Sequence, residues 1–356
     1  KPVIVGGIGP RGVVSTASYE AREFGVHSAQ STVVARKLCP EGTFLPSNHA
    51  LYSEISKKFM AILREFSPIV ISVSIDEAYL DMTGTKDIYG PPQKAAEEIR
   101  KNIQNGIGLP VSIGIGPNRL VAKVCTEYAK PDGIFQIQQV EAENFFGPQP
   151  VRNLPGIGPK AEEALGNLNI FTLKQLANAP VGLLRRALGP NRADYIRPRA
   201  RGIDNEPLQE RGKAKSISAE TTFETDISGQ SEMIKIVKQL SERVGARLRK
   251  SGQLARGATI KLRYRDFTTI TRQRTFPNPH DGDQAIYETA QALLVKAMKE
   301  RRESIRLIGV SVTGLGPKAT QLSLLDTHPT ADSDTSVALD RIRDRFGNEA
   351  ISRGTQ

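Results

Sequence analysis

Two adjacent acidic residues interrupt a strongly apolar stretch of the sequence. Residues 69–73 form an apolar run that leads into Asp76 and Glu77, and a second short apolar run ends before Thr83 and Gly84. β-Branched residues bounded in this way are typical of a hairpin or strand end in a buried sheet. An ionised carboxylate beside apolar strands must be paired or must bind a cation, and carboxylate oxygens are ligands that Mg²⁺ prefers. The acidic pair therefore predicts a metal site.

The geometry of a strand limits what this pair can do alone. Neighbouring residues on a strand point to opposite faces, so Asp76 and Glu77 can share a metal only at a strand end, bulge or turn. A two-metal phosphoryl-transfer site normally needs a further carboxylate from another strand. Asp81 and Glu127 are the candidates in this chain. A solvated turn is the alternative interpretation of an Asp-Glu pair, although the apolar flanks favour a site.

Length and composition indicate an ordinary globular protein. A chain of 356 residues can form about two or three domains, each with its own core. It has no run of about 18 apolar residues and no signal-peptide pattern at its start, so we expect a cytoplasmic protein without membrane contact. We also expect a monomer. Cys39 and Cys125 lack partners at disulfide-motif or zinc-site spacing, so neither feature is predicted.

The charge is strongly positive and unevenly distributed. The chain carries 49 Lys and Arg against 38 Asp and Glu, a net charge of +11, and such a surplus favours a polyanionic partner. Residues 213–317 hold 19 Lys and Arg against 11 Asp and Glu, so this segment contributes +8. A solvated charged face is the alternative. The concentration of charge nevertheless favours a nucleic-acid-binding domain in this segment.

Strand and helix patterns alternate through the first 150 residues. Apolar residues at helical spacing over 52–66 precede the acidic hairpin, and a helix over 92–105 and a glycine-broken strand over 111–116 follow it. Residues 11–46 indicate a small helical insertion between strands. This order predicts an α/β or α+β domain with the carboxylates at the ends of central strands.

A helical module follows this domain. Residues 151–204 contain short helices and no clear strand pattern, and residues 205–215 are polar and indicate an exposed linker. The turn with Gly156 and Gly158, followed by Lys160, suits a helix-hairpin-helix in which backbone N–H groups approach a phosphate at a helix N-terminus. An ordinary glycine-containing turn is the alternative.

The basic segment has its own element order. Strands are predicted over 216–223, 259–264, 268–276 and 305–315, and helices over 232–250 and 283–302. This is the β-α-β-β-α-β order of the split-βαβ motif. One further amphipathic helix is predicted near residues 339–346.

Cations alternate with apolar residues along the second of these strands, and the spacing recurs on the next strand. The second strand would bury its apolar residues and line Lys261, Arg263 and Arg265 along one open face, where they can follow a phosphate backbone. An edge strand protected by charge is the alternative. The predicted DNA-contacting cations are Lys261, Arg263, Arg265, Arg272 and Arg274.

Several stretches together resemble one known family. They are VVSTASYEAR (13–22), SIDEAYLD (74–81), GIGPN (114–118) with Ala122 and Lys123, KPDG (130–133), LPGIG (154–158), and Lys215 with Ser216. In order and spacing, over residues 1–317, they resemble the Y-family translesion DNA polymerases, most closely the DNA polymerase IV branch. The resemblance implies template-directed DNA synthesis past damaged bases by two-metal phosphoryl transfer. It also implies two Mg²⁺ ions per active site, with primer-template DNA and deoxynucleoside triphosphates as partners.

The resemblance also implies a fold and a set of domains. The expected fold is multidomain α/β and α+β, a right-hand polymerase with a helix-hairpin-helix thumb and a βαββαβ little finger. The implied domains are a palm (1–10 and 47–150), fingers (11–46), a thumb (151–204), a linker (205–215), a little finger (216–317) and a tail (318–356).

Functional residues follow from the same resemblance. Asp76 looks like a Mg²⁺ ligand, and Glu77 is similar to the family's catalytic acidic residue beside the primer terminus, so both are predicted catalytic and metal-binding residues. Fixed donors and cations suit charge that develops on transferring phosphates. The residues that look like contacts to the incoming triphosphate are Thr16, Tyr19, Arg22 and Lys130.

Residues 321–325 resemble the clamp-binding box of bacterial replication proteins, with Leu325 where an aromatic residue is common. A sliding clamp is therefore a predicted partner. The predicted contacts are Gln321, Leu322, Leu324 and Leu325.

The chain as written departs from the family pattern at its start. Family members begin with a strand that bears the first metal-binding aspartate, followed by a bulky residue that excludes ribonucleotides, and Lys1 stands downstream of both. This departure leaves an alternative hypothesis, a noncatalytic DNA-binding protein that corresponds to an N-terminally truncated polymerase.

Overall fold

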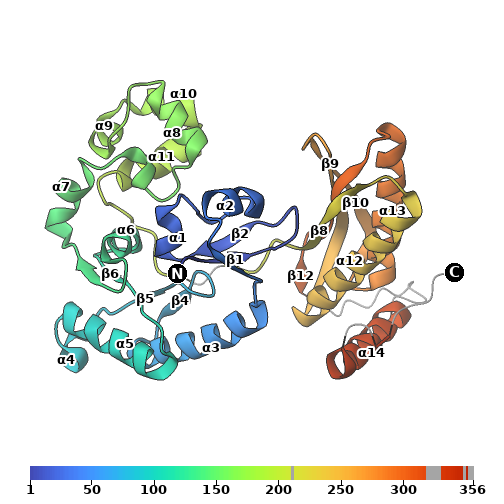
Figure 1. Cartoon of the computed structure of the whole chain (residues 1–356), viewed down its shortest axis with the longest axis horizontal. Coiled ribbons are helices and arrows are strands. Elements are labelled where there is room, and N and C mark those ends of the chain that lie inside the picture. The colour runs from blue at the N-terminus through green and yellow to red at the C-terminus, as the bar shows by residue number, and fades with distance from the viewer. Residues whose placement is uncertain (210–211, 318–329, 348–349, 352–356) are drawn as a thin grey trace. The chain divides into compact units, whose positions relative to one another are not determined.

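The computed structural model describes residues 1–209, 212–317, 330–347 and 350–351 (Figure 1). Contacts divide the chain into two compact units, one formed by Lys1–Ser47 with Gly212–Gln356 and the other by Asn48–Arg211. Among the helices in these described ranges, none is long and apolar enough to cross a membrane.

The N-terminal part of the first unit is a small three-stranded sheet with two helices. Its central strand β1 (Val3–Gly6) pairs antiparallel with β2 (Val14–Ala17) and parallel with β3 (Thr43–Leu45). The helices α1 (Tyr19–Glu23) and α2 (Thr32–Leu38) lie between β2 and β3 in the chain. The strand β1, which the predicted palm segment 1–10 contains, therefore pairs with two strands of the predicted fingers segment 11–46.

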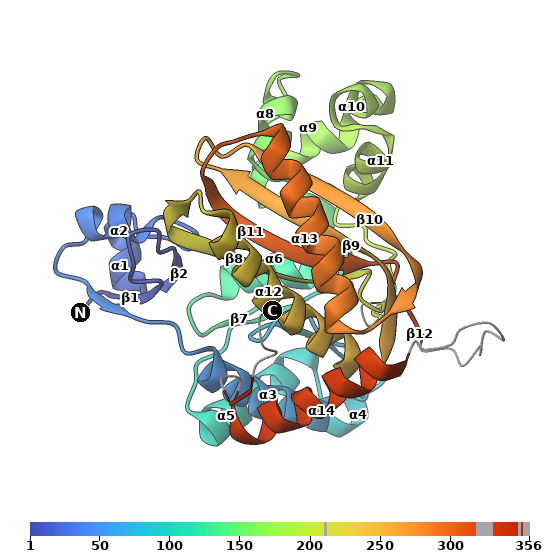
Figure 2. The same ribbon diagram turned by 90° about the vertical axis from the view of Figure 1, so that its right-hand side faces the viewer.

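The C-terminal part of the first unit has the predicted β-α-β-β-α-β order. Its strands lie in the order β10-β9-β11-β8, all antiparallel, and two helices cover one face of the sheet (Figure 2). The core between them contains fully buried Val244, Ile260 and Leu294. The elements are β8 (Ser216–Ile227), α12 (Gln230–Lys250), β9 (Gln253–Tyr264), β10 (Thr269–His280), α13 (Asp283–Glu300), β11 (Ile305–Thr313) and β12 (Gly316–Pro317).

A buried arginine joins the C-terminal helix α14 (Thr330–Phe346) to this domain. The Arg249 side chain is 6% exposed, its Nη1 lies 2.8 Å from Oδ1 of Asp283, and its Nε lies 2.6 Å from Oδ2 of Asp340 on α14. Burial alone would lower the pKa of Arg249, but hydrogen bonds to Asp340 and Asp283 raise this pKa above its ordinary value. The predicted helix near residues 339–346 is confirmed and belongs to the packed structure.

Gly245, in the middle of α12, makes room for this ion pair. A Cβ at this position would lie 1.9 Å from Oδ1 of Asp283 and 3.0 Å from Nη1 of Arg249. A glycine inside a helix costs about 1 kcal/mol relative to alanine. That cost is offset because α13 can begin directly against α12, where Asp283 reaches Arg249.

The second unit begins with the acidic hairpin and its supporting helices. The predicted helices and hairpin are present, and β4 pairs antiparallel with β5 while β6 pairs parallel with β7. The elements are α3 (His49–Phe66), β4 (Val70–Ser72), β5 (Ala78–Leu80), α4 (Lys86–Tyr89), α5 (Pro92–Ile107), β6 (Ile113–Ile115), α6 (Arg119–Ala129) and β7 (Ile134–Gln136).

Short helices complete the second unit, as predicted for residues 151–204. Their core is continuous with α6, because Val121 and Cys125 lie in the same hydrophobic cluster as Leu165. The predicted domain boundary at residue 150 therefore divides the helices and strands into two groups that share one hydrophobic core. The helices are α7 (Ala142–Phe146), α8 (Pro159–Gly166), α9 (Leu173–Asn178), α10 (Val181–Leu188) and α11 (Pro190–Arg199), with 3₁₀ turns at Gln139–Glu141 and Val151–Asn153.

The linker begins in a buried ion-pair cluster. The Asp204 side chain is 2% exposed and bonds both Arg199 at 2.8 Å and Arg119 at 3.1 Å, and Arg119 also pairs with Glu206. Of the predicted exposed linker, the described residues 205–207, 209 and 212–215 are exposed, and Leu208 is partly buried. The chain is thus anchored to the second unit shortly after the last helix of that unit.

The variant Gly245→Ala tests the packing of α12 against α13. The added methyl group would displace Asp283 from Arg249, so the free energy of unfolding of this domain should fall by about 1–3 kcal/mol. Calorimetry of the full chain measures this change. Gly316→Ala is the control, since no heavy atom lies within 4 Å of its added Cβ, and it should change stability by less than about 0.5 kcal/mol. Equal effects would contradict the packing role.

Candidate active site

The turn between β4 and β5 presents the two acidic side chains. The backbone N–H groups of Val73 and Ser74 both donate to the carbonyl of Glu77, at 2.8 and 3.2 Å, so the acidic pair lies at the end of the hairpin. This position satisfies the requirement that the two neighbours lie at a turn or strand end. Asp76 is exposed, and its carboxylate accepts a 2.5 Å hydrogen bond from the Ser74 hydroxyl. Asp76 is therefore less buried than its apolar flanks predict.

Glu77 is paired with a lysine of the protein itself. Its Oε1 accepts a hydrogen bond from Nζ of Lys123 on α6, and the two side chains are 35% and 33% exposed. Burial alone would lower the pKa of Lys123, but the hydrogen bond and charge of Glu77 raise this pKa above its ordinary value. Burial, and then the charge of Glu77, raise the pKa of Tyr79 on β5. The site is thus a carboxylate and ammonium pair beside one exposed carboxylate.

Neither candidate for a third carboxylate completes the site. Asp81 lies at the other end of β5, where its N–H donates to the carbonyl of Ile69. At about 3.3 Å per strand residue, its backbone lies about 13 Å along the strand from that of Glu77. Both carboxylate oxygens of Glu127 bind Lys130. Within the part of the chain that the structure describes, no group of three or more His, Cys, Asp or Glu could hold a metal.

The donor set of the hairpin nevertheless suits one kind of metal site. Mg²⁺ usually keeps several waters and is held by one or two carboxylates together with substrate phosphates. Asp76 offers an exposed carboxylate, and Glu77 a partly exposed one next to it. The pair therefore fits a divalent cation that arrives with a phosphate ligand.

Two glycines on and beside β6 bring α6 close enough for Lys123 to reach Glu77. A Cβ on Gly114 would lie 2.1 Å from the carbonyl oxygen of Ala122, and a Cβ on Gly116 would lie 2.7 Å from the Ala122 nitrogen. Asn118 begins α6 by accepting a hydrogen bond from the N–H of Val121 at 2.9 Å. In the GIGPN stretch, the two glycines thus allow close contact between strand and helix, and the asparagine caps the helix.

Lys130 follows the last residue of α6 and is also paired. Its Nζ lies 2.9 Å from each carboxylate oxygen of Glu127, one turn earlier. Both side chains are exposed, at 42% for Lys130 and 56% for Glu127. The predicted triphosphate contact is therefore bound to a carboxylate of the preceding helix.

The other predicted triphosphate contacts lie in the first unit at one strand-to-helix junction. Thr16 lies near the end of β2, Tyr19 and Arg22 lie on α1, and all three residues are exposed. The guanidinium of Arg22 lies 5.1 Å from the centre of the Tyr19 ring, and its Nε donates to the carbonyl of Ala17 at 3.0 Å. Arg22 is thus oriented by the junction itself.

The predicted phosphate-binding turn precedes α8. Gly156 has φ of +102°, a conformation that side chains rarely adopt, and its carbonyl accepts a 2.6 Å hydrogen bond from Arg192. Gly158 is the N-cap of α8, and no heavy atom lies within 4 Å of a Cβ built on it. Lys160, in the first turn, is exposed. The helix N-terminus is therefore accessible to an anion.

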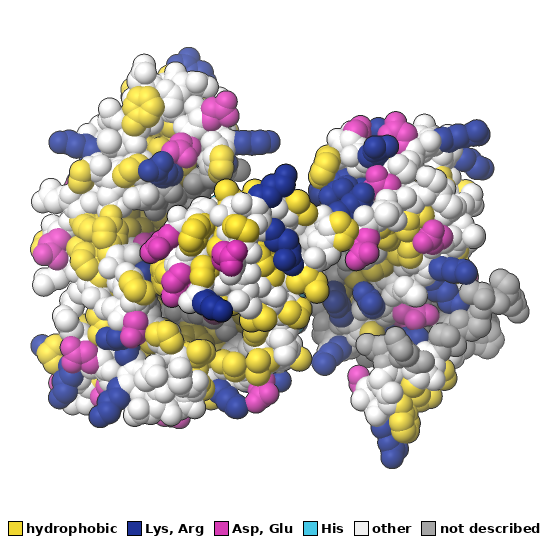
Figure 3. Space-filling model, in the orientation of Figure 1, with side chains coloured by type: hydrophobic (Ala, Val, Ile, Leu, Met, Phe, Trp, Pro, Cys, Tyr) yellow, Lys and Arg dark blue, Asp and Glu magenta, His cyan; other side chains and the backbone are white. Residues whose placement is uncertain are grey.

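Part of the predicted row of cations lies on the open face of the sheet. Leu262 and Tyr264 are fully buried, as predicted, while Lys261 and Arg263 alternate with them on the other face. Lys261 lies 2.8 Å from a carboxylate oxygen of Glu220, and Nε of Arg263 donates to Thr269 at 2.9 Å. Arg265 is exposed just beyond the end of β9. In Figure 3, Lys and Arg side chains recur over the visible face of this domain, among Asp and Glu.

Arg272 and Arg274, which repeat the cation spacing on the next strand, lie on the face of the sheet opposite to Lys261. They lie opposite Ile260 and Ala258, which are buried beneath the helices, and residues directly opposite share a face. Arg272 accordingly bonds Glu300 on α13 at 2.6 Å. The same cation spacing recurs on both strands, but the register between the strands places the two rows on opposite faces of the sheet.

The sequence patterns did not reveal the hydroxyl groups on the open face. The register brings rows of Ser and Thr from the four strands to the side that carries Lys261. Each strand contributes only one to a few hydroxyl groups to this face, and they form a surface only when the strands are paired. Representative positions are Ser218, Thr259, Thr271 and Ser311.

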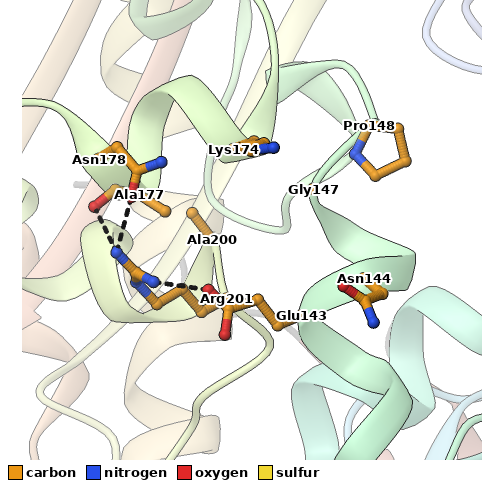
Figure 4. A pocket seen from close by; sticks show the side chains of 9 residues that line it. All are labelled: Glu143, Asn144, Gly147, Pro148, Lys174, Ala177, Asn178, Ala200 and Arg201. Atoms are coloured by element: carbon orange, nitrogen blue, oxygen red, sulfur yellow. Dashed lines mark hydrogen bonds and ion pairs between the residues drawn. The ribbon is translucent and has the colours of Figure 1, made fainter.

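A cavity of about 320 Å³ lies elsewhere in the second unit, between α7, α9 and the end of α11 (Figure 4). Arg201 spans one side of it, bonding Glu143 at 2.5 Å and Asn178 at 2.8 Å. The charge of Arg201 is thus already compensated, and none of the predicted site residues lines the cavity. Its lining residues are Glu143, Asn144, Gly147, Pro148, Lys174, Ala177, Asn178, Ala200 and Arg201.

Family models match both ends of the chain. Residues 1–127 match the impB/mucB/samB family, and residues 214–324 match the C-terminal domain of the same family. DNA polymerase IV of Dehalococcoides mccartyi strain CBDB1 is 41% identical over 355 residues, covering 99% of this chain and 90% of the relative. DNA polymerase IV of Desulfatibacillum aliphaticivorans is 38% identical over 354 residues, covering 98% and 89%.

Solved structures share the fold. A Y-family DNA polymerase chimera matches with a TM-score of 0.80 at 24% identity, covering 89% of this chain and 92% of that chain. An insertion ternary complex of Dbh DNA polymerase matches with a TM-score of 0.60 at 24% identity, covering 88% and 91%. The fold is thus the right-hand fold of Y-family DNA polymerases, and the predicted fold class is confirmed. Within that class, the chain belongs to the impB/mucB/samB family, in its bacterial DNA polymerase IV branch.

The variant Gly114→Ala tests whether close packing of β6 on α6 supports the site. The added methyl group would overlap the backbone of α6, so the free energy of unfolding of the second unit should fall by about 1–3 kcal/mol or more. Denaturant unfolding of the full chain measures this change. Gly166→Ala is the control, because its Cβ would meet the Phe171 ring at an ordinary 3.7 Å. A Gly114→Ala protein as stable as this control would refute the packing argument.

Proposed function

We propose that the chain is a DNA-directed DNA polymerase for translesion synthesis, which adds deoxynucleotides to a primer end by phosphoryl transfer. One observation carries the proposal: Asp76 and Glu77 lie together on the β4–β5 turn, beside the cation Lys123. The relatives named DNA polymerase IV support it, since they match nearly the whole chain. As a polymerase that acts on chromosomal DNA, the protein would work in the cytoplasm.

The acidic pair is proposed as the metal-binding part of the site. Asp76 and Glu77 would supply carboxylate oxygens to divalent cations, and we propose two Mg²⁺ ions in the active state. When bound, Mg²⁺ would neutralise charge on the transferring phosphate groups. Asp76 is already exposed and oriented by Ser74, whereas Oε1 of Glu77 is bound to Lys123.

Four residues are proposed to bind the incoming triphosphate. Hydroxyl and guanidinium donors at fixed positions stabilise charge without reorganising during the reaction. The stacking of Arg22 on Tyr19 supports such a fixed position. The proposed contacts are Thr16, Tyr19, Arg22 and Lys130.

DNA is proposed to bind through phosphate contacts at two places. At α8, the N-terminal N–H groups beside Gly156 and Gly158, with Lys160, would hold one phosphate. On the little finger, Lys261 and Arg263 with the neighbouring hydroxyl rows would follow the backbone, and Arg265 would extend this contact. Arg272 and Arg274 can contribute only from the helix-covered side of the sheet.

A sliding clamp is the remaining proposed partner. The supporting observation is the sequence of Gln321, Leu322, Leu324 and Leu325, and these residues lie outside the described ranges.

Primer extension tests the polymerase proposal. With Mg²⁺, primer-template DNA and four deoxynucleoside triphosphates, the chain should extend the primer, and Asp76→Ala should lower the rate by at least about 100-fold because a metal ligand is removed. Asp87→Ala is the control, since Asp87 is an exposed acid on α4. Equal extension by the parent chain and Asp76→Ala would refute the site. DNA binding without extension by the parent chain would support the noncatalytic alternative.

Salt-dependent DNA binding tests the open face of the little finger. The double variant Arg263→Ala with Arg265→Ala should weaken binding and reduce the slope of log K against log salt by about 1 for each DNA phosphate that the variant no longer neutralises. Fluorescence anisotropy at several salt concentrations measures the slope. The double variant Arg272→Ala with Arg274→Ala should change it less, because both residues lie on the helix-covered side. The reverse order of effects would contradict the proposed surface.

A further inference from the structure

Four charged side chains of alternating sign form two ion pairs along α6. Glu77 bonds Lys123, and Glu127 bonds Lys130 at 2.9 Å. Three of the four residues belong to α6 or to the position immediately after it, and Glu77 comes from the facing hairpin. The two pairs are therefore neighbours on one helix.

Both residues that the proposed function needs are paired with another side chain of the protein. Glu77 is proposed to bind a metal and Lys130 a triphosphate, yet each is bound to an oppositely charged side chain of the protein. A magnesium-bound triphosphate that binds Glu77 and Lys130 competes with both ion pairs for these two side chains. Opening would release Lys123 and Glu127 at the same time.

The two released residues are placed to pair with each other. Lys123 and Glu127 are four residues apart on α6, and residues at this spacing lie on one helix face with Cβ atoms about 5–6 Å apart. All four side chains are between 33% and 56% exposed, so none is locked in the interior. A new pair would need only side-chain rotation.

We propose that Lys123 and Glu127 are positioning residues that exchange partners when a magnesium-bound deoxynucleoside triphosphate binds. Before binding, Lys123 holds Glu77 and Glu127 holds Lys130. After binding, Glu77 faces the metal, Lys130 faces the phosphates, and Lys123 pairs with Glu127. This inference rests on the proposed function. Lys123 and Glu127 are the counter-ions of Glu77 and Lys130 before the ligand binds, and they become each other's counter-ions after it binds.

A double-mutant cycle tests the exchange through binding rather than activity. The parent chain, Lys123→Met, Glu127→Gln and the double variant are titrated with Mg²⁺ and a nonhydrolysable deoxynucleoside triphosphate in the presence of primer-template DNA. Lys123→Met should tighten binding by about two- to fivefold, because Glu77 loses its competitor. Glu127→Gln frees Lys130 both in the parent chain and in the Lys123→Met variant. Only in the parent chain does it also leave Lys123 without a partner in the bound state.

The expected signature is therefore non-additivity. Glu127→Gln should favour binding more in the Lys123→Met background than in the parent background, by about twofold. The control cycle uses Glu54→Gln and Lys58→Met, since these residues form an exposed i, i+4 pair on α3 at 2.8 Å. It should show no coupling in nucleotide binding.

Three results would overturn the exchange. Additive effects of Lys123→Met and Glu127→Gln would show that these two residues do not pair in the bound state. Weaker binding by Lys123→Met would show that Lys123 contacts the ligand instead of holding Glu77. Failure of the parent chain to bind the nucleotide would refute the proposed function, and the exchange with it, whereas binding with additive effects would refute the exchange alone.

Discussion

The close contact of β6 with α6 is the constraint on which the second unit depends. Gly114 and Gly116 admit the backbone of α6 where any side chain would overlap it. One side of α6 then contributes Val121 and Cys125 to the core of the helical module. Another side directs Lys123 towards the acidic hairpin. The same helix thus connects the candidate active site to the core of the helical module, so a change in its position would alter both.

Burial separates the ion pairs that hold the structure together from those that are free to change. Arg249 with Asp283, and Arg199 with Asp204, are nearly inaccessible, and removing one partner of such a pair costs about 3–5 kcal/mol. Glu77 with Lys123, and Glu127 with Lys130, are partly exposed, and pairs of this kind contribute about 0–1 kcal/mol. The buried pairs therefore fix α14 and the start of the linker, whereas the exposed pairs can open for a ligand.

Local sequence patterns predicted most elements because each depended on residues close in the chain. The alternation of Leu262 and Tyr264 with cations identified β9, and the apolar spacing over residues 52–66 identified α3. Local patterns did not predict how the strands pair with one another. The position of β1 between β2 and β3, and the opposite faces of Arg263 and Arg272, follow from hydrogen-bond register, which no single strand encodes.

The sequence by itself determined the chemistry of the site: two adjacent carboxylates at a strand end, a glycine turn before a helix, and a basic C-terminal domain. Only the tertiary structure decided which charges meet. It paired Glu77 with Lys123, 46 residues away, and it placed Asp81 at the wrong end of the hairpin to join Asp76. The physical reason is that charge and hydrogen-bonding capacity belong to each residue, whereas contact between distant residues is set by packing, here by two glycines that let α6 approach β6.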